Sequence, residues 1–193
     1  MNDRIFGDRE KAMEDAYFRD QDARLLGKLR QRADLDEIAI ELGRKFQVDD
    51  PQLLLKVKEL GITLETASGF FLAPLVEVAW ADGRVKKEER STVLKLARER
   101  SIEAGSQSYK CLEQWLDVRP TDEFFATALI VLKAGFAVLP HAEREERIRT
   151  VLDACEAVAQ ASAGITHLFG LDGVSSVEAA ILQGIERALR GHD

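Results

Sequence analysis

The chain has 193 residues, of which 46% are hydrophobic and 32% charged, and its formal net charge is −7. This length suits one domain, and the periodic apolar residues exclude a chain that is disordered throughout. The acidic balance argues against a general nucleic-acid binder, because the phosphate backbone attracts clustered Lys and Arg. The amino terminus runs into charged residues without an apolar segment, so no signal peptide is predicted. Since the two cysteines also lack a CxxC partner, we expect a cytoplasmic protein.

Residues 1–61 are predicted to form a charged helical arm followed by short helices. From residue 8 to about residue 32, opposite charges recur four positions apart, as in Lys11 and Asp15, which supports an exposed helix. Its apolar residues form two patches, Met13, Tyr17 and Phe18 in one and Leu25, Leu26 and Leu29 in the other. We therefore expect an arm that docks at two points. Two short helices should follow, beginning near Asp34 and at Pro51.

Residues 62–193 are predicted to form one compact all-helical domain. The pattern changes from Thr63, and a helix that is apolar on most faces should contain Phe70 to Trp80 and stop at the turn Asp82-Gly83. Further helices are expected over residues 86–103, 106–119, 121–139, 141–163 and from about 175 onward. The segment 121–139 is the most apolar and should lie at the centre. The longest apolar stretch within it, from Phe124 to Leu139, is interrupted by Lys133 and shorter than the ~20 residues of a membrane span, so no membrane insertion is predicted.

One pattern occurs twice and is the strongest candidate for a binding site. Asp82-Gly83 is followed six positions later by Glu88, and Asp172-Gly173 is followed at the same distance by Glu178. Two such units packed together would gather four carboxylates, the ligands that Ca²⁺ or Mg²⁺ prefer. The alternative is structural, because Asp-Gly is common in turns and acids are favoured in a first helical turn. Ser175 to Glu178 also has the pattern of a capping box.

The residues around the first motif resemble a known family. The run Phe71-Leu72-Ala73-Pro74-Leu75-Val76-Glu77-Val78-Ala79-Trp80-Ala81-Asp82-Gly83-Arg84-Val85-Lys86-Lys87-Glu88-Glu89-Arg90 resembles the signature of the TerB-like (tellurite resistance) domains. Residues 158–162 and 170–178 resemble the second half of that domain. The resemblance covers about residues 65–190. It implies an all-helical domain with pseudo-symmetric helix-loop-helix halves, a link to tellurite or stress response, and a divalent-cation site at Asp82, Glu88, Asp172 and Glu178.

This sequence departs from the family pattern at the first motif. The family often has Ser, Thr or Asp after the Val, where this chain has Lys86 and Lys87. Two positive charges beside the expected cluster weaken both the helix cap and the cation site. In the second copy Val174 directly follows Gly173, one residue earlier than Val85 follows Gly83. The two repeats are therefore not strictly superimposable.

The arm carries a second resemblance. Phe6-Gly7-Asp8-Arg9-Glu10-Lys11-Ala12-Met13-Glu14 and Asp20-Gln21-Asp22 are similar to the start of the alphaproteobacterial ATP synthase inhibitor (zeta) subunit. This resemblance implies a regulatory protein that contacts a protein partner through its charged N-terminal helix. The identity of the partner and any self-association stay open.

No catalytic arrangement is visible in the sequence, so the chain is expected not to be an enzyme. The GxxxxGK[ST], GxGxxG and GxSxG motifs are absent, and the three histidines lack metal-ligand spacing. Glu77 is unusual because it lies in an otherwise apolar helix. It would either join the acidic cluster or face the solvent. The two functional hypotheses are a non-enzymatic TerB-like module that binds a divalent cation and a regulatory interaction module that uses the arm.

Overall fold

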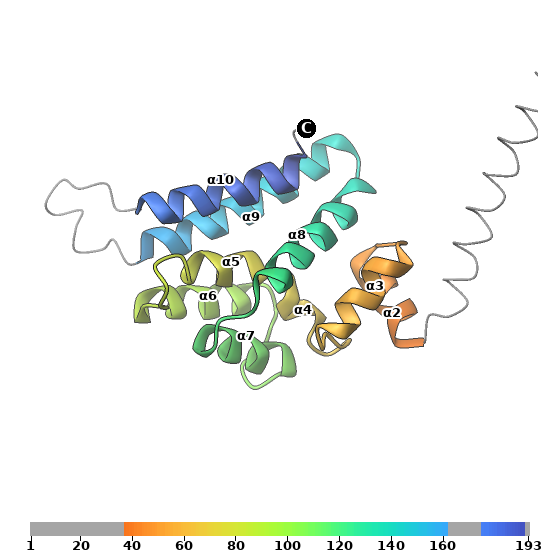
Figure 1. Cartoon of the computed structure of the whole chain (residues 1–193), viewed down its shortest axis with the longest axis horizontal. Helices are drawn as coiled ribbons and strands as arrows, with labels where there is room; N and C mark the ends of the chain where they lie inside the picture. Colours follow the sequence, from red (N-terminus) through yellow and green to blue (C-terminus); the bar gives the residue numbers. More distant parts are fainter. Residues whose placement is uncertain (1–36, 162–174, 192–193) are drawn as a thin grey trace, which may run out of the picture.

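A computed structural model describes residues 37–161 and 175–191, and within these ranges every regular element is a helix (Figure 1). The prediction of an all-α fold is therefore confirmed for this part of the chain. The predicted arm lies outside it. The helices are α2 (Glu37–Phe46), α3 (Pro51–Glu59), α4 (Ala67–Phe70), α5 (Ala73–Ala79), α6 (Lys87–Glu99), α7 (Gln107–Asp117), α8 (Asp122–Ala137), α9 (His141–Ala161) and α10 (Ser176–Arg190).

Short polar side chains begin several of these helices, as the sequence predicts. The Ser106 hydroxyl accepts a hydrogen bond from the backbone N–H of Tyr109, at 3.2 Å, at the start of α7. Thr121 accepts one from Phe124 N–H, also at 3.2 Å, at the start of α8. Each bond satisfies a backbone donor that has no partner inside the helix, which stabilises the helix by about 1 kcal/mol.

Helix α5 is the centre of the fold (Figure 1). Six of its seven residues are buried, and it packs against α6, α7, α8, α9 and α10. Helices α9 and α10 lie side by side across one side of it (Figure 1). At its C-terminal end, the Trp80 indole N–H donates to the carbonyl of Trp115, at 2.8 Å, and ties α5 to α7. A helix enclosed on so many sides must be apolar nearly all round, as its sequence is.

The predicted continuous helix up to Trp80 is instead two helices, α4 and α5, separated at Phe71 and Leu72. The physical reason is Pro74, which has no N–H to donate and whose ring clashes with the preceding turn of a continuous helix. Pro74 is tolerated here because it lies in the first turn of α5. Leu72 N–H bonds to the Gly69 carbonyl at 2.9 Å, which closes the turn between the two helices.

The expectation that the helix over residues 121–139 lies at the centre is wrong. Helix α8 buries Phe124, Phe125 and Val131, but Ile130 on its other face is 52% exposed and Lys133 is exposed. Apolar composition alone does not distinguish a central helix from one that leaves aliphatic residues in water. In the part of the chain that is described, no helix is long and apolar enough to span a membrane.

One hydrophobic core includes residues on both sides of the predicted boundary at residue 61. Phe46, at the end of α2, contacts Phe70 and Phe71 with ring centroids 5.9 and 5.0 Å apart. The α2 and α8 backbones approach closely at Gly135, where a Cβ atom would lie 2.6 Å from the Phe46 carbonyl oxygen. Only glycine at this position allows α2 to lie against α8.

Substituting Gly135 by Ala should destabilise the protein. The added methyl group meets a backbone atom, which cannot rotate away, so α2 has to shift from α8 at a cost of about 1–3 kcal/mol. Gly184→Ala is the matched control, because Gly184 lies inside α10 with open space around it. There the better helix propensity of Ala should stabilise by about 0.5–1 kcal/mol. Urea unfolding of both variants measures the difference, and equal stabilities would contradict this account.

Candidate functional site

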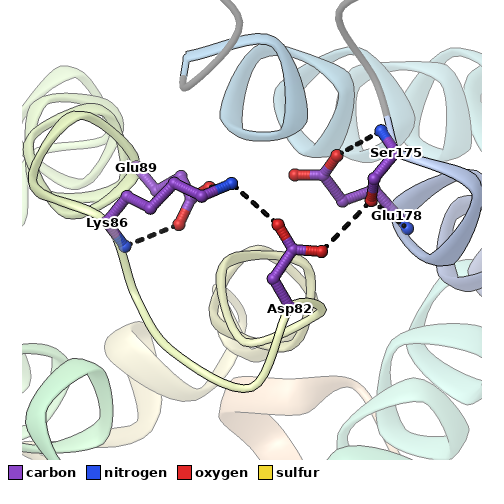
Figure 2. Close-up of polar contacts among 5 residues, drawn as sticks. All are labelled: Asp82, Lys86, Glu89, Ser175 and Glu178. Atoms are coloured by element: carbon purple, nitrogen blue, oxygen red, sulfur yellow. Dashed lines mark hydrogen bonds and ion pairs between the residues drawn. The ribbon is translucent and has the colours of Figure 1, made fainter.

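Asp82 joins the N-terminal ends of two helices that are distant in sequence (Figure 2). One of its carboxylate oxygens accepts from the Lys86 ammonium at 2.7 Å, next to the start of α6. The other accepts from the Ser175 hydroxyl at 3.2 Å, next to the start of α10. Asp82 follows α5, and the turn is completed by Gly83, whose φ of 79° is unfavourable for other residues. The predicted Asp-Gly turn is thus present.

The starts of α6 and α10 repeat the same local arrangement. In α6 the Lys86 N–H donates to the Glu89 carboxylate at 2.8 Å, and in α10 the Ser175 N–H donates to the Glu178 carboxylate at 2.6 Å. Both glutamates are only 2% exposed. Glu178 N–H also bonds to the Ser175 hydroxyl at 3.2 Å, which confirms the predicted capping box. We call Asp82, Lys86, Glu89, Ser175 and Glu178 the helix-end cluster.

The four predicted metal ligands are placed differently by the structure. Asp82 and Glu178 lie in the helix-end cluster, whereas Glu88 is exposed on the first turn of α6 and Asp172 lies outside the described residues. Glu89 occupies the position in α6 that Glu178 occupies in α10. Counting from the valine that follows each Asp-Gly pair in the sequence, rather than from the aspartate, identifies Glu89, because Val85 and Val174 precede Glu89 and Glu178 by four positions.

The helix-end cluster already contains a positive charge. The Lys86 ammonium lies 2.7 Å from Asp82 and 3.3 Å from the second oxygen of Glu89. The hydrogen bond between Lys86 and Asp82 is the main reason that the pKa of the Asp82 carboxyl is lowered and that of the Lys86 ammonium raised. Both groups are therefore charged across the neutral pH range. The pairing contributes stability above the usual Asp pKa and loses it as acidification protonates Asp82.

A divalent cation does not fit this arrangement of the described residues. Ca²⁺ takes about six to eight oxygen ligands, whereas both Asp82 oxygens and at least one oxygen of each glutamate already accept hydrogen bonds. The Lys86 ammonium would also repel a metal ion placed between the carboxylates. Over residues 37–161 and 175–191, no group of three or more His, Cys, Asp or Glu side chains could hold a metal ion.

Glu77 follows neither of the two predicted alternatives. It lies on α5 with a partly buried side chain, and its buried Oε2 has no hydrogen-bond partner among the described residues. Burial raises the pKa of its carboxyl, with nearby Arg119 acting in the opposite direction. Cys155 is fully buried, and desolvation together with the nearby Glu77 charge raises the pKa of its thiol. Glu77 is thus a destabilising charge in the interior.

A groove lies at the N-terminal end of α5, whereas the helix-end cluster lies beyond its C-terminal end. It has a volume of about 350 Å³ and is lined by the end of α2, the α4–α5 junction, the end of α6, α8 and α9. Its apolar lining residues are Phe46, Phe71, Leu72, Leu75, Leu132, Phe136, Leu139 and Val151. This size falls in the range of pockets that bind small ligands or single side-chain clusters.

The charged residues that line the groove are all cations. Lys45, Arg100 and Arg147 are exposed at its edge, and the described lining contains no Asp, Glu, His or Cys. The Lys45 ammonium also donates to the Leu64 carbonyl at 2.8 Å. In a chain with a net charge of −7, this combination of an apolar floor and a cationic edge favours an amphipathic, acidic occupant. The sequence did not reveal the groove, because its residues come from five separate segments.

In comparisons with known proteins, no family model, no curated protein and no solved structure matched this chain. The resemblances to the TerB-like domains and to the ATP synthase inhibitor subunit therefore stay predictions that rest on the motifs alone.

The buried Glu77 charge predicts a specific dependence of stability on pH. Because its folded-state pKa is raised, the native state holds the proton to a higher pH than the unfolded chain. Stability should therefore fall as pH rises from the usual Glu pKa through the folded value. Glu77→Gln removes this loss, so its free energy of unfolding should exceed that of the wild type increasingly between pH 4 and pH 7.

The gain should reach up to about 1 kcal/mol, after allowing for the solvent screening of a partly exposed group. Urea titrations at several pH values give the measurement. Glu59→Gln, at an exposed position of α3, is the control for the loss of one negative charge. Parallel pH profiles for the wild type and Glu77→Gln would refute the assignment.

Proposed function

We propose that this chain is a non-enzymatic regulatory interaction module whose N-terminal arm occupies the groove until a protein partner takes it. The observation that carries the proposal is the groove itself, with its apolar floor and three cations at the edge. Its lining offers no carboxylate, imidazole or thiol for acid–base or nucleophilic chemistry among the described residues. A TerB-like relationship and a link to stress response are compatible with this proposal and depend on the motif at Asp82-Gly83.

The arm has the composition that the groove requires. Residues 10–22, which lie outside the described residues, contain five acidic and two basic residues. Met13 and Tyr17 are four positions apart and would share one face of a helix, with Phe18 beside them. The apolar patch matches the floor of the groove and the excess negative charge matches Lys45, Arg100 and Arg147. Electrostatic complementarity of this kind selects a partner and fixes its orientation more than it adds affinity.

The arm is also long enough to reach the groove. The 14 residues 23–36 connect the acidic segment to α2, and with residues 23–32 helical, as the sequence predicts, and residues 33–36 extended they would span about 28–29 Å. Helix α2, with ten residues, is about 15 Å long, and its last residues line the groove. A connection of this length lets residues 10–22 fold back past α2. Intramolecular docking then benefits from a high effective concentration, typically millimolar.

Paramagnetic relaxation in the full-length chain tests the proposal. A nitroxide on Ala16→Cys, in a Cys111→Ser background that leaves only buried Cys155, should broaden the methyl resonances of Leu132, Leu139 and Val151. Arg147→Glu should reduce this broadening. Reversing one charge at the edge costs about 1 kcal/mol, which changes the ratio of docked to undocked arm about fivefold.

Lys110→Glu is the matched control, since it makes the same charge reversal at an exposed residue of α7 outside the groove lining. It should leave the broadening unchanged. Broadening that is absent from the groove, or that is the same in Arg147→Glu, would disprove the docking. Broadening that grows with protein concentration would place the arm of a second copy in the groove and would also overturn the intramolecular arrangement.

A further inference from the structure

Three carboxylates meet at the helix-end cluster, and this accumulation of negative charge requires compensation. Glu89 and Glu178 are 2% exposed, and Asp82 lies between the two helices that they begin (Figure 2). Glu89 and Glu178 each benefit from the positive end of a helix dipole, whereas Asp82 follows the C-terminal end of α5, where the dipole is negative. Two dipole ends of about half a charge each leave most of the three negative charges unbalanced. A cation in contact with these groups therefore stabilises the junction, and Arg84 adds a further positive charge near Asp82.

The Lys86 ammonium has the position that such a cation needs. It contacts a carboxylate from the α5–α6 turn and a carboxylate from α6, at 2.7 and 3.3 Å. Asp82 in turn bonds to Ser175 at 3.2 Å, so the positive charge acts on the α10 end through a shared carboxylate. The Lys86 side chain is 29% exposed, and its ammonium is held by two carboxylates, so the charge is only partly screened by solvent.

We propose that the Lys86 ammonium is the resident cation of this junction, in the place that the family resemblance assigns to a divalent metal ion. A tethered ammonium has a fixed stoichiometry and needs no metal from solution. The two halves of the domain are then held together by a covalently attached charge, and the junction is independent of Ca²⁺ and Mg²⁺. The adjacent Lys87 is exposed on the first turn of α6 and does not share this role.

Thermal melts of the full-length chain test this proposal. The wild-type midpoint should be the same with excess chelator and with millimolar Ca²⁺ or Mg²⁺. Lys86→Met keeps the length of the side chain but removes the charge, and it should lower the midpoint by about 2–4 °C. Lys87→Met makes the same chemical change one residue further along and should leave the midpoint nearly unchanged. Lys86→Arg keeps a positive charge and should retain most of the wild-type stability. This variant still tests the proposal if Lys86→Met fails to fold.

A double variant tests whether Lys86 acts through its contact with Asp82 or whether its loss simply damages α6. The midpoint losses of Lys86→Met and Asp82→Asn should be less than additive in the double variant, because both remove the same interaction. A wild-type midpoint that rises saturably with one divalent ion, and does so no longer in Asp82→Asn, would show a metal site and overturn the proposal. Equal effects of Lys86→Met and Lys87→Met would also overturn it.

Discussion

The structure depends on the complete enclosure of α5 by five other helices. This seven-residue helix exposes almost none of its surface, so every neighbouring helix gains apolar contact from it. The enclosure also has a cost, because polar groups at or near α5 lose water and must find partners. Trp80 finds one in the carbonyl of Trp115, whereas one oxygen of Glu77 finds none among the described residues. The helix-end cluster and the groove then lie at the two ends of α5.

At its C-terminal end, α5 leads directly to the turn that presents Asp82 to α6 and α10. Both helices begin there with a buried glutamate, which brings negative charge together at a point that solvent screens only in part. At its N-terminal end, Phe71, Leu72 and Leu75 form part of the groove floor. The contrast between these ends is one of charge: the helix-end cluster has an excess of carboxylates around one ammonium, and the groove has cations without a lining carboxylate among the described residues.

The sequence predicted local features well, because these depend on few neighbouring residues. The all-α class, the caps at Ser106 and Thr121 and the capping box at Ser175 follow from periodicity and short-range hydrogen bonding. The central position of α5 could not be predicted in the same way, because α8 contains the longer apolar run but leaves Ile130 exposed. Which of two apolar helices is enclosed is decided by tertiary packing. The sequence pattern paired Glu88 with Glu178, whereas the structure has Glu89 at the position in α6 that Glu178 has in α10. One residue along a helix rotates the side chain by about 100°, so the pattern alone did not determine which glutamate faces inward.

The distribution of charge connects the groove to the acidity of the whole chain. A protein with 34 acidic and 27 basic residues has no general need for a purely cationic edge around an apolar groove. Exposed cations on such a surface normally pair with nearby carboxylates, as Lys95 does with Glu99 at 3.8 Å. The described lining of the groove contains no acid beside Lys45, Arg100 and Arg147, an arrangement that favours a local positive potential in an otherwise acidic chain. Because salt screens exposed charges over about 10 Å, this potential acts mainly on a segment already held close to the groove. A tethered acidic arm would stay close to the groove at any protein concentration. A free partner would come as close only if it bound tightly enough to replace the arm. Under the proposed arrangement the arm would be the resting occupant of the groove, and its release would be the step that a partner has to drive.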